Sequence, residues 1–361
     1  MSAAPLVLVL AGGTGGHVYP ALAVAEELRG RGYRVEWVGT RRGLEARVVP
    51  AAGLVLHTLA VRGLRGKGAR QALLGVLALL WSVPQALALL LRRWPRCLVG
   101  MGGYASGPVA AVGWLLRRPL LLHEQNAVAG TTNRLLAPLA RCCVSGFPGA
   151  FPARIACEAV GNPVRAALVA RGTPAGYDFD GTRPLRLLVL GGSLGAQPLN
   201  RLFPAVLDAL RDAGAGVELW HQCGPAHAAA TGERYGAHAG AAVRCEPFID
   251  DMASAYLWAD LVLCRAGALT VAELAVCGRP SILVPLPQAI DDHQRHNARF
   301  LSERGAALLV PQAQLDAPAL AATIAGLARD PARLRQMAAA AHACARADAA
   351  AAVADRCEAL L

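Results

Sequence analysis

Two segments of the chain repeat one pattern that few folds can accommodate. Residues 6–28 read LVLVLAGGTGGHVYPALAVAEEL, and residues 185–210 read LRLLVLGGSLGAQPLNRLFPAVLDAL. Each combines an apolar strand, a glycine-rich turn and a helix, which is the opening βα unit of a parallel sheet covered by helices. With 361 residues, the chain is long enough for two such domains.

Apolar segments alternate with helical segments along the rest of both halves. This alternation predicts an α/β fold with two Rossmann-like domains, each built on a parallel sheet. Residues 158–184 are rich in Pro, Gly and polar residues, which predicts an interdomain linker, and residues 317–361 have a helical pattern without strands. The further strands are predicted at 34–39, 97–103 and 119–126 in the first half, and at 217–224, 259–267 and 280–287 in the second.

Composition narrows the classes of partner. The formal charge of +11 favours acidic partners, but aromatic residues make up only 5% of the chain. Because single-stranded nucleic acid is bound by aromatic stacking beside positive charge, we expect no nucleic acid. The ten cysteines show no paired metal spacing and are predicted to be reduced thiols of a cytosolic protein. The N-terminus lacks a basic region before its apolar run, so it predicts a strand rather than a signal peptide.

Residues 72–91, ALLGVLALLWSVPQALALLL, carry no charge, and three arginines follow by position 96. This segment is compatible with a helix pair or kinked helix buried in the protein, with a helix on a membrane surface, or with a membrane span. A span would split the sheet of a Rossmann-like domain and is disfavoured. We expect residues 62–96, helped by Trp114, to dock peripherally on an anionic membrane surface.

The first glycine loop, GGTGGH at residues 12–17, has almost no side-chain bulk. Its backbone N–H groups can approach a phosphate or a sugar at a helix N-terminus, although a tight turn without a ligand is the simpler alternative. The loop does not fit G-x-G-x-x-G, and no acidic residue ends the next strand, which opposes NAD binding. Arg41 and Arg42 could suit a 2′-phosphate, so an NADP reductase remains an alternative.

The second half offers two further ligand loops. Ser193 in GGSLGA supplies a hydroxyl beside the same kind of backbone turn. In RAGALTVAEL, residues 268–270 place N–H groups at a helix N-terminus, where a diphosphate can bind. Glu273 has two readings: its carboxylate accepts both hydroxyls of a ribose, or Thr270 and Glu273 form a T-x-x-E capping box.

Nine motifs occur in order along the chain and together resemble the MurG family. These are the bacterial UDP-N-acetylglucosamine:undecaprenyl-pyrophosphoryl-MurNAc-pentapeptide N-acetylglucosaminyltransferases of peptidoglycan synthesis. The motifs are GGTGGHVYPALAVA, LRGKG, GMGGYASGP, HEQNAVAGTTN, GNPVR, GGSLGA, FIDDM, CRAGALTVAEL and DDHQRHNA.

The resemblance implies a GT-B glycosyltransferase, with two Rossmann-like domains whose parallel sheets face a central cleft. Residues 1–163 would form the acceptor and membrane-binding domain, and a C-terminal helix at about 343–361 would pack back on it. Residues 164–342 would bind UDP-GlcNAc. The family pattern is not complete, because Leu194 stands where other members carry Gln and the loop around Gln288 is longer than in some members.

The resemblance also implies site residues, in three groups. Donor contacts on the N-domain side are expected from Thr14, Gly15, Gly16 and Asn126. On the other side they are expected from Arg165, Ser193, Ile249, Ala268, Leu269, Thr270, Glu273 and Gln294. Acceptor contacts are expected from Gly13, Gly103 and Tyr104. Within the donor site, the Ile249 backbone would bind uracil, Glu273 the ribose, Ser193 and the 268–270 amides the diphosphate, and Asn126 and Gln294 the GlcNAc.

The expected reaction is inverting: the 4-OH of MurNAc on lipid I attacks C1 of GlcNAc and expels UDP. His17 is the first candidate for the base because an imidazole titrates near neutral pH. It could instead bind the acceptor diphosphate or the backbone, and Glu124 is the second candidate. The Asp178-Phe179-Asp180 motif lies in the predicted linker and Asp291-Asp292-His293 beside a helix-terminus site, so we expect no bound metal and no cofactor.

Two further function classes remain open beside the NADP reductase. One is another GT-B enzyme with a different nucleotide-sugar or acceptor, and the other is a membrane-associated binding protein without catalysis. The expected partners are UDP-GlcNAc, a lipid-linked MurNAc-pentapeptide acceptor and an anionic membrane. The expected location is peripheral, on the cytoplasmic face of the plasma (inner) membrane.

Overall fold

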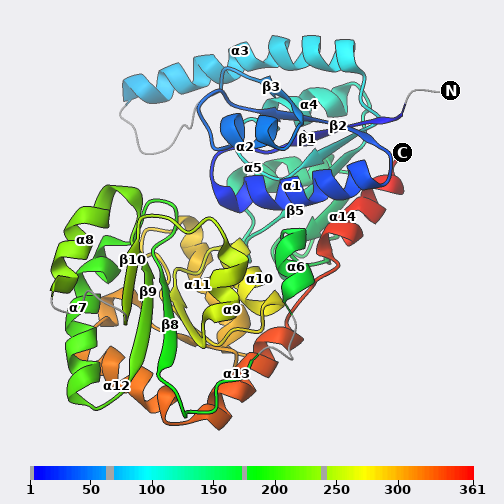
Figure 1. Ribbon diagram of the computed structural model, residues 1–361. Coiled ribbons are helices and arrows are strands. Elements are labelled where there is room, and N and C mark those ends of the chain that lie inside the picture. The colour runs from blue at the N-terminus through cyan, green and yellow to red at the C-terminus, as the bar shows by residue number, and fades with distance from the viewer. Residues whose placement is uncertain (1–3, 62–68, 173–176, 237–241) are drawn as a thin grey trace. The chain divides into compact units, whose positions relative to one another are not determined.

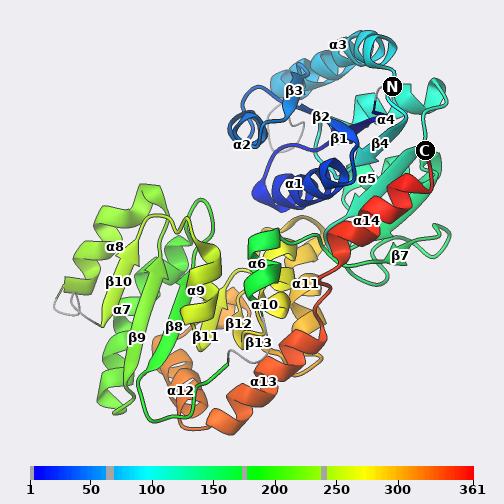
Figure 2. The ribbon, with the colours of Figure 1, turned by 45° about the vertical axis from the view of Figure 1, so that its right-hand side comes forward.

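The computed structural model describes residues 4–61, 69–172, 177–236 and 242–361. Within it the chain forms two compact units, drawn in Figure 1 and, turned, in Figure 2. The first unit comprises Met1–Arg165 and Arg346–Leu361, and the second comprises Ala166–Ala345. Each unit is an α/β layer structure with its own hydrophobic core.

In the described part of the first unit, seven strands form one parallel sheet in the order β3-β2-β1-β4-β5-β6-β7. Strand β1 is entirely buried, which explains its uninterrupted apolar sequence. The elements are β1 (Leu6–Leu10), α1 (Gly15–Gly30), β2 (Arg34–Gly39), α2 (Glu45–Ala51), β3 (Val55–Thr58), α3 (Ala69–Arg93), β4 (Cys97–Gly100), α4 (Ser106–Leu115), β5 (Leu120–Glu124), α5 (Thr131–Leu136), β6 (Cys142–Ser145), β7 (Glu158–Ala159) and α14 (Ala349–Glu358).

The last helix, α14, belongs to the first unit although the whole second unit precedes it in the chain. It packs against α1, and Val353, Ala354 and Cys357 are part of the same buried core as β1 (Figure 2). At the end of this contact the guanidinium of Arg31 pairs with Asp355 at 2.6 Å and with Glu358 at 2.8 Å. Apolar burial and these ion pairs together fasten the C-terminal helix to α1.

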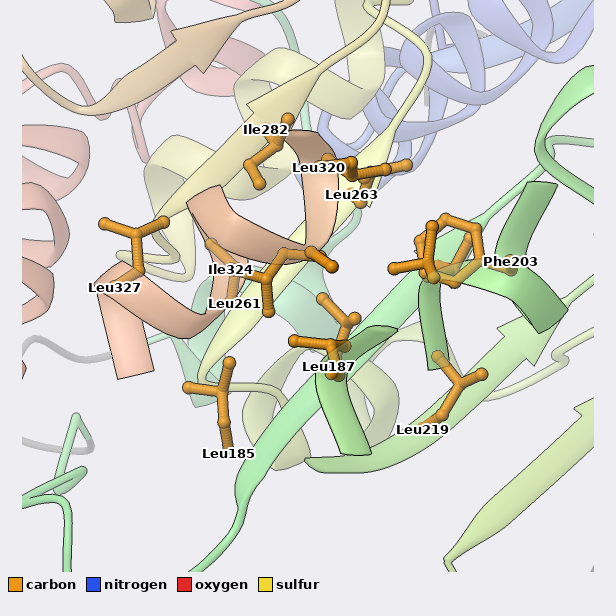
Figure 3. Packing of buried hydrophobic residues seen from close by; sticks show 14 of the residues in the cluster. Leu185, Leu187, Phe203, Leu219, Leu261, Leu263, Ile282, Leu320, Ile324 and Leu327 are labelled. Atoms are coloured by element: carbon orange, nitrogen blue, oxygen red, sulfur yellow. The ribbon is translucent and has the colours of Figure 1, made fainter. Parts of the chain in front are cut away.

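The described residues of the second unit form a parallel sheet of six strands in the order β10-β9-β8-β11-β12-β13. Figure 3 shows Leu187, Leu261 and Ile324 among the leucine and isoleucine side chains that fill the layer between this sheet and α12. The elements are α6 (Ala166–Arg171), β8 (Leu185–Leu190), α7 (Gln197–Asp212), β9 (Val217–Gln222), α8 (Ala228–Tyr235), β10 (Val243–Glu246), α9 (Met252–Trp258), β11 (Leu261–Cys264), α10 (Ala268–Val276), β12 (Ser281–Leu283), α11 (His293–Ser302), β13 (Ala307–Leu309), α12 (Ala317–Ala328) and α13 (Pro331–Ala343).

The interdomain linker predicted at 158–184 contains the division between the two units, after Arg165, and also short elements of regular structure. Within it, Glu158–Ala159 forms edge strand β7 and Ala166–Arg171 forms α6, with Leu168 buried. Phe179, which lies inside the Asp-Phe-Asp motif, is 1% exposed and belongs to the core of the second unit. The frequent Pro and Gly residues indicated a loop. The short elements form because of tertiary packing, which no local sequence pattern shows.

Strand order explains which loops meet. In both sheets the order reverses at the first strand, so that β1 lies between β2 and β4, and β8 lies between β9 and β11. The loops after two adjacent central strands then leave the same edge of the sheet in opposite directions, which is where ligands bind in this class of fold. In the first unit this brings GGTGGH next to GMGGY, and in the second it brings GGSLGA next to RAG.

We expect acid to destabilise the second unit through His221. This side chain is buried beside Phe203 and Tyr235, and burial lowers its pKa from the ordinary 6.5 to about 3. Below pH 6.5, His221 is protonated in the unfolded chain but stays neutral in the folded unit. The free energy of unfolding is therefore at its full value above pH 6.5 and decreases as the pH falls below it. At pH 5 the loss is about 2 kcal/mol. Melting temperatures at pH 7.5 and 5 should show a smaller fall for His221→Phe than for the wild-type protein; an equal fall would contradict this.

Candidate functional site

The first glycine loop opens helix α1, with Thr14 at the N-cap position and Gly15 and Gly16 in the first turn. The amide of Gly13 donates to the Glu45 carboxylate at 3.1 Å. A buried side chain therefore already accepts the hydrogen bond of the Gly13 amide. Thr14 is exposed, and Gly15 and Gly16 are half-buried, so these three residues are accessible for the donor contacts expected of them.

Glu45 is a residue that the sequence analysis missed. Its side chain is fully buried and also accepts hydrogen bonds from the Thr40 amide at 2.8 Å and the Thr40 hydroxyl at 2.7 Å. A Cβ atom at Gly39 or Gly43 would lie within 2.5 Å of the Glu45 side chain. The signal in the sequence was the GTRRGLE segment at residues 39–45, in which two glycines precede an isolated carboxylate.

The second loop of the first unit, residues 101–105, packs directly on the first. A Cβ atom at Gly103 would lie 2.4 Å from the Gly12 carbonyl oxygen, and one at Gly102 would lie 2.9 Å from His17 Nδ1. Both glycines have positive φ near 90°. Only glycine fits at these two positions, and the adjacent Tyr104 is left 47% exposed at the rim.

His17 lies in the first turn of α1 and is half-buried. Its Nδ1 atom is 2.8 Å from Oε1 of Gln125, which follows strand β5 and is buried. The structure therefore brings together three predicted features, namely the glycine loop, the GMGGY loop and the HEQN motif.

Glu124 lies at the end of β5 and is 1% exposed. Its carboxylate accepts hydrogen bonds from the amide and side chain of Asn126, the amide of Gly130 and the side chain of Asn133, all between 2.9 and 3.1 Å. These four donors favour a structural role for Glu124, which holds the loop after β5, over the role of catalytic base. They also orient the half-buried side chain of Asn126.

In the second unit, the GGSLGA loop is held by Gln222 at the end of β9. The Gly192 amide donates to Gln222 Oε1 at 2.9 Å, and the Gln222 amide donates back to the Gly192 carbonyl at 3.1 Å. Gly195 has positive φ, and a Cβ atom there would lie 2.1 Å from the Cys223 carbonyl oxygen. Ser193 is left exposed at the tip of the loop.

Helix α10 begins at Ala268 with Gly267 as its N-cap residue, so Ala268, Leu269 and Thr270 occupy the first three helical positions. Amides at these positions have no acceptor within a helix and bind anions readily. The capping-box interpretation of Glu273 is wrong, because Thr270 is not the N-cap. Glu273 lies a turn and a half into the helix.

Glu273 is 5% exposed, and its Oε2 accepts a hydrogen bond from the Tyr256 hydroxyl at 3.1 Å. Burial and the adjacent carboxylate raise the pKa of Tyr256 well above its ordinary value, so the phenol stays protonated and donates. No motif in the sequence pointed to Tyr256, which lies on α9, 17 residues before Glu273, and orients the Glu273 carboxylate.

The remaining predicted donor residues differ in their surroundings. Ile249 is buried in the loop between β10 and α9, next to an exposed Phe248. Gln294 lies in the first turn of α11, and its Oε1 accepts the Leu286 amide at 3.0 Å. Arg165 was expected on the side of the second domain, but it belongs to the first unit, where its guanidinium lies 5.3 Å from the centre of the Tyr19 ring. That placement of Arg165 was wrong.

The acidic motifs have local partners. Asp178 pairs with Arg183 at 3.1 Å, and Asp180 accepts hydrogen bonds from the amide and hydroxyl of Thr182. Across the described ranges, no three acidic, histidine or cysteine side chains are grouped as metal ligands.

A groove of about 1390 Å³ lies in the first unit beside α3. Its lining includes Gly12, Gly13 and Tyr104 of the two glycine loops and the arginines Arg41, Arg42 and Arg92. Trp81 and Leu89 of α3 supply an apolar wall. The groove thus combines positive charge with apolar surface next to the glycine loops.

Comparison with known proteins identifies the family to which the chain belongs. The glycosyltransferase family 28 N-terminal domain matches residues 7–145, and the family 28 C-terminal domain matches residues 186–353. A UDP-N-acetylglucosamine–N-acetylmuramyl-(pentapeptide) pyrophosphoryl-undecaprenol N-acetylglucosamine transferase from Alkalilimnicola ehrlichii is 55% identical over 351 residues, which are 97% of this chain and 98% of the relative. The protein of the same name from Stutzerimonas stutzeri is 52% identical, over 97% of both chains. The chain belongs to the MurG family.

Solved structures agree with this assignment. The MurG of Acinetobacter baumannii superposes with a TM-score of 0.83 at 36% identity, covering 98% of this chain and 99% of that one. A glycosyltransferase of kitacinnamycin matches with a TM-score of 0.72 at 18% identity, covering 99% of both chains, which shows the shared fold alone. The two Rossmann-like domains predicted from the sequence are thereby confirmed as the fold of MurG and related glycosyltransferases.

Helix α3 of this MurG family member has an unusual surface. The helix packs on α4, and the described residues of α3 that are buried are Ser82, Ala86 and Leu90. Two of these three side chains are small. The large apolar side chains point outward, and in Figure 1 the helix runs along the outside of the unit. Those exposed by at least 40% are Leu80, Trp81, Val83, Leu87 and Leu91 on α3, Trp94 after it, and Trp114 and Leu115 at the end of α4.

The interpretation of residues 72–91 as a buried helix pair or kinked helix is therefore wrong. Pro84 lies inside one continuous helix, and its described outer face is apolar and exposed. Within the described residues, no helix has the length and apolar character needed to cross a bilayer. The side chains of residues 69–77 lie outside the described residues.

Proposed function

We propose that this protein transfers GlcNAc from UDP-GlcNAc to the MurNAc 4-OH of lipid I, giving lipid II and UDP in peptidoglycan synthesis. The observation that carries the proposal is the match over 97% of the chain to transferases of that name. The oxygen of the acceptor hydroxyl bonds to C1 of GlcNAc as the C1–O bond to UDP breaks. The UDP oxygen keeps the electron pair, and the hydroxyl proton goes to a base.

The second unit supplies what the donor needs. The amides of residues 268–270 and the Ser193 hydroxyl would bind the diphosphate, whose negative charge grows as UDP leaves. Glu273, held by Tyr256, would accept the ribose hydroxyls, and the backbone at Ile249 would bind uracil. The amide nitrogen of Gln294 would donate to GlcNAc, since its oxygen already accepts the Leu286 amide.

The first unit supplies the acceptor side and the base. The cationic, apolar groove beside Tyr104 suits a lipid-linked diphosphate, because arginines pair with phosphate oxygens and Trp81 and Leu89 would contact the isoprenoid. His17 would accept the proton of the MurNAc 4-OH, and Asn126, oriented by Glu124, would contact GlcNAc.

A ligand screen followed by an assay tests this function. UDP-GlcNAc and UDP should raise the melting temperature, whereas GDP-sugars and NADP should leave it unchanged, because ligands that bind only the folded state stabilise it by mass action. Transfer of labelled GlcNAc to a lipid I analogue should follow. Stabilisation by NADP, or transfer to a soluble acceptor but not to the lipid-linked one, would contradict the proposal.

We further propose that the protein binds the cytoplasmic face of the plasma membrane peripherally. The exposed apolar face of α3 and the nearby Trp114 support this, since such surfaces are rare on proteins that stay in water. Among the described cations of residues 62–96, Arg93 pairs with Glu36 at 3.1 Å and Arg96 donates to the Leu361 carbonyl. Arg92 and Arg117 are exposed and could pair with anionic headgroups.

Vesicle sedimentation tests the membrane proposal. The wild-type protein should bind vesicles that contain anionic lipid, and the double variant Leu80→Glu/Trp81→Glu should bind at least tenfold more weakly, because both side chains leave apolar contact with the acyl boundary. Binding by the wild type should also weaken with salt.

The matched control is Gln314→Glu/Gln336→Glu, which adds the same charge at exposed positions of the second unit. It should bind vesicles like the wild type, and all three proteins should show the same melting-temperature response to UDP-GlcNAc. If both double variants lose vesicle binding equally, the loss is caused by the added negative charge alone, and α3 is not the docking surface.

A further inference from the structure

The first unit contains a buried chain of hydrogen bonds that ends at His17. His123 Nε2 lies 2.9 Å from the Gly161 carbonyl oxygen, and His123 Nδ1 lies 3.1 Å from the side-chain nitrogen of Gln125. The side-chain oxygen of Gln125 lies 2.8 Å from His17 Nδ1. His123 and Gln125 are at most 1% exposed, so water does not compete for these bonds.

The direction of every bond in this chain is fixed from its buried end. A carbonyl oxygen only accepts, so His123 Nε2 carries a hydrogen and donates to Gly161. Burial lowers the pKa of His123 to about 4, so the ring is neutral at physiological pH and its Nδ1 is a bare acceptor. The Gln125 NH₂ group must then face His123, where it also approaches the His123 carbonyl oxygen at 3.3 Å.

The orientation of Gln125 decides the protonation of His17. With its NH₂ group directed to His123, the amide presents its oxygen to His17, and an oxygen acceptor requires a hydrogen on His17 Nδ1. A neutral imidazole holds only one hydrogen, so Nε2 of His17 carries a lone pair. The main chain around the relay is also fixed, because Asn162 donates to the Gln125 carbonyl and Asn133 to the His123 carbonyl.

We propose that Gln125 and His123 are positioning residues that hold His17 in the Nδ1–H tautomer, with Nε2 ready to take the proton of the acceptor hydroxyl. This inference rests on the proposed role of His17 as the base. When Nε2 accepts the proton, the imidazolium keeps its Nδ1–H bond to the Gln125 oxygen, and no proton needs to travel along the chain. The hydrogen bond from His123 to the Gly161 carbonyl thus determines the tautomer of His17, through the two further hydrogen bonds that Gln125 makes.

Two variants of Gln125 separate orientation from packing. Gln125→Glu and Gln125→Met both remove the donor to His123, but only the glutamate keeps an oxygen acceptor for His17 Nδ1–H. We expect Gln125→Met to lower kcat roughly tenfold or more with little change in donor KM, as loss of the tautomer-setting partner does in other histidine-dependent enzymes. Gln125→Glu should restore most of that kcat. Ser145→Ala is the control for a general loss of stability, because it removes a buried hydrogen bond from the last residue of β6 to the Phe147 carbonyl.

Nitrogen NMR of histidine-labelled protein reads the tautomer directly. The chain has nine histidines, and the His17 signals are assigned by their absence from His17→Ala. In the wild type, Nδ1 should give the pyrrole-type shift and Nε2 the pyridine-type shift, and Gln125→Met should lose this preference. A proton on Nε2 of His17 in the wild type, or equal kcat for Gln125→Met and Gln125→Glu, would overturn the positioning role. If the tautomer behaves as expected but His17→Ala keeps its kcat, the positioning role stands and the assignment of the base fails.

Discussion

Glu273→Ala should be the most damaging single substitution in the donor site. The variant loses the carboxylate that accepts the ribose hydroxyls, which should cost about 2–4 kcal/mol of transition-state binding. This corresponds to a fall of roughly 30- to 900-fold in kcat/KM for UDP-GlcNAc. Steady-state kinetics with varied UDP-GlcNAc at saturating acceptor measures the effect.

Tyr256→Phe is the matched control for Glu273. It removes the hydrogen bond that the phenol donates to Glu273 Oε2 but leaves the carboxylate in place. We expect a lower melting temperature in both variants and a large kinetic loss only in Glu273→Ala. If Glu273→Ala melts lower but keeps normal donor kinetics, Glu273 serves the stability of α10 and not the ribose.

His17→Ala should lower kcat by about 100-fold or more, the usual range for loss of a general base. Donor binding should change little, because the donor diphosphate and ribose contacts are proposed on the second unit. The measurement is the pH dependence of kcat and of kcat/KM for the acceptor in both proteins. A raised acceptor KM with an unchanged pH profile would instead make His17 an acceptor-binding residue.

Sequence pattern was sufficient for the frame of the fold. The buried strands such as Leu6–Leu10 and Leu185–Leu190 are apolar runs, and each is followed by glycines that a close approach of loops requires. Short edge strands such as Glu158–Ala159 carry no such run. Their pairing depends on neighbours far along the chain, so the sequence analysis assigned that region to a linker.

For the candidate site as well, the sequence revealed the residues within local motifs but not the partners that hold them. Residues within motifs, such as His17 and Glu273, were found because their spacing from a strand end is local. Their partners were missed: Gln125 was not linked to His17 although it lies in a quoted motif, and Tyr256 and Glu45 come from other elements. The capping box failed for a related reason, since T-x-x-E is a local pattern and the true helix start is set by Gly267.

The side chains of Glu45 and Gln222 distinguish the two glycine loops. At corresponding places, the Gly13 amide donates to the carboxyl of Glu45, and the Gly192 amide donates to the neutral side-chain amide of Gln222. We therefore expect the first loop to favour a bound anion less than the second. Any phosphate bound beside the first loop must rely on exposed arginines such as Arg41 and Arg42, whose attraction falls as ionic strength rises. Ionic strength should thus act on acceptor recognition far more than on nucleotide recognition, within a single polypeptide.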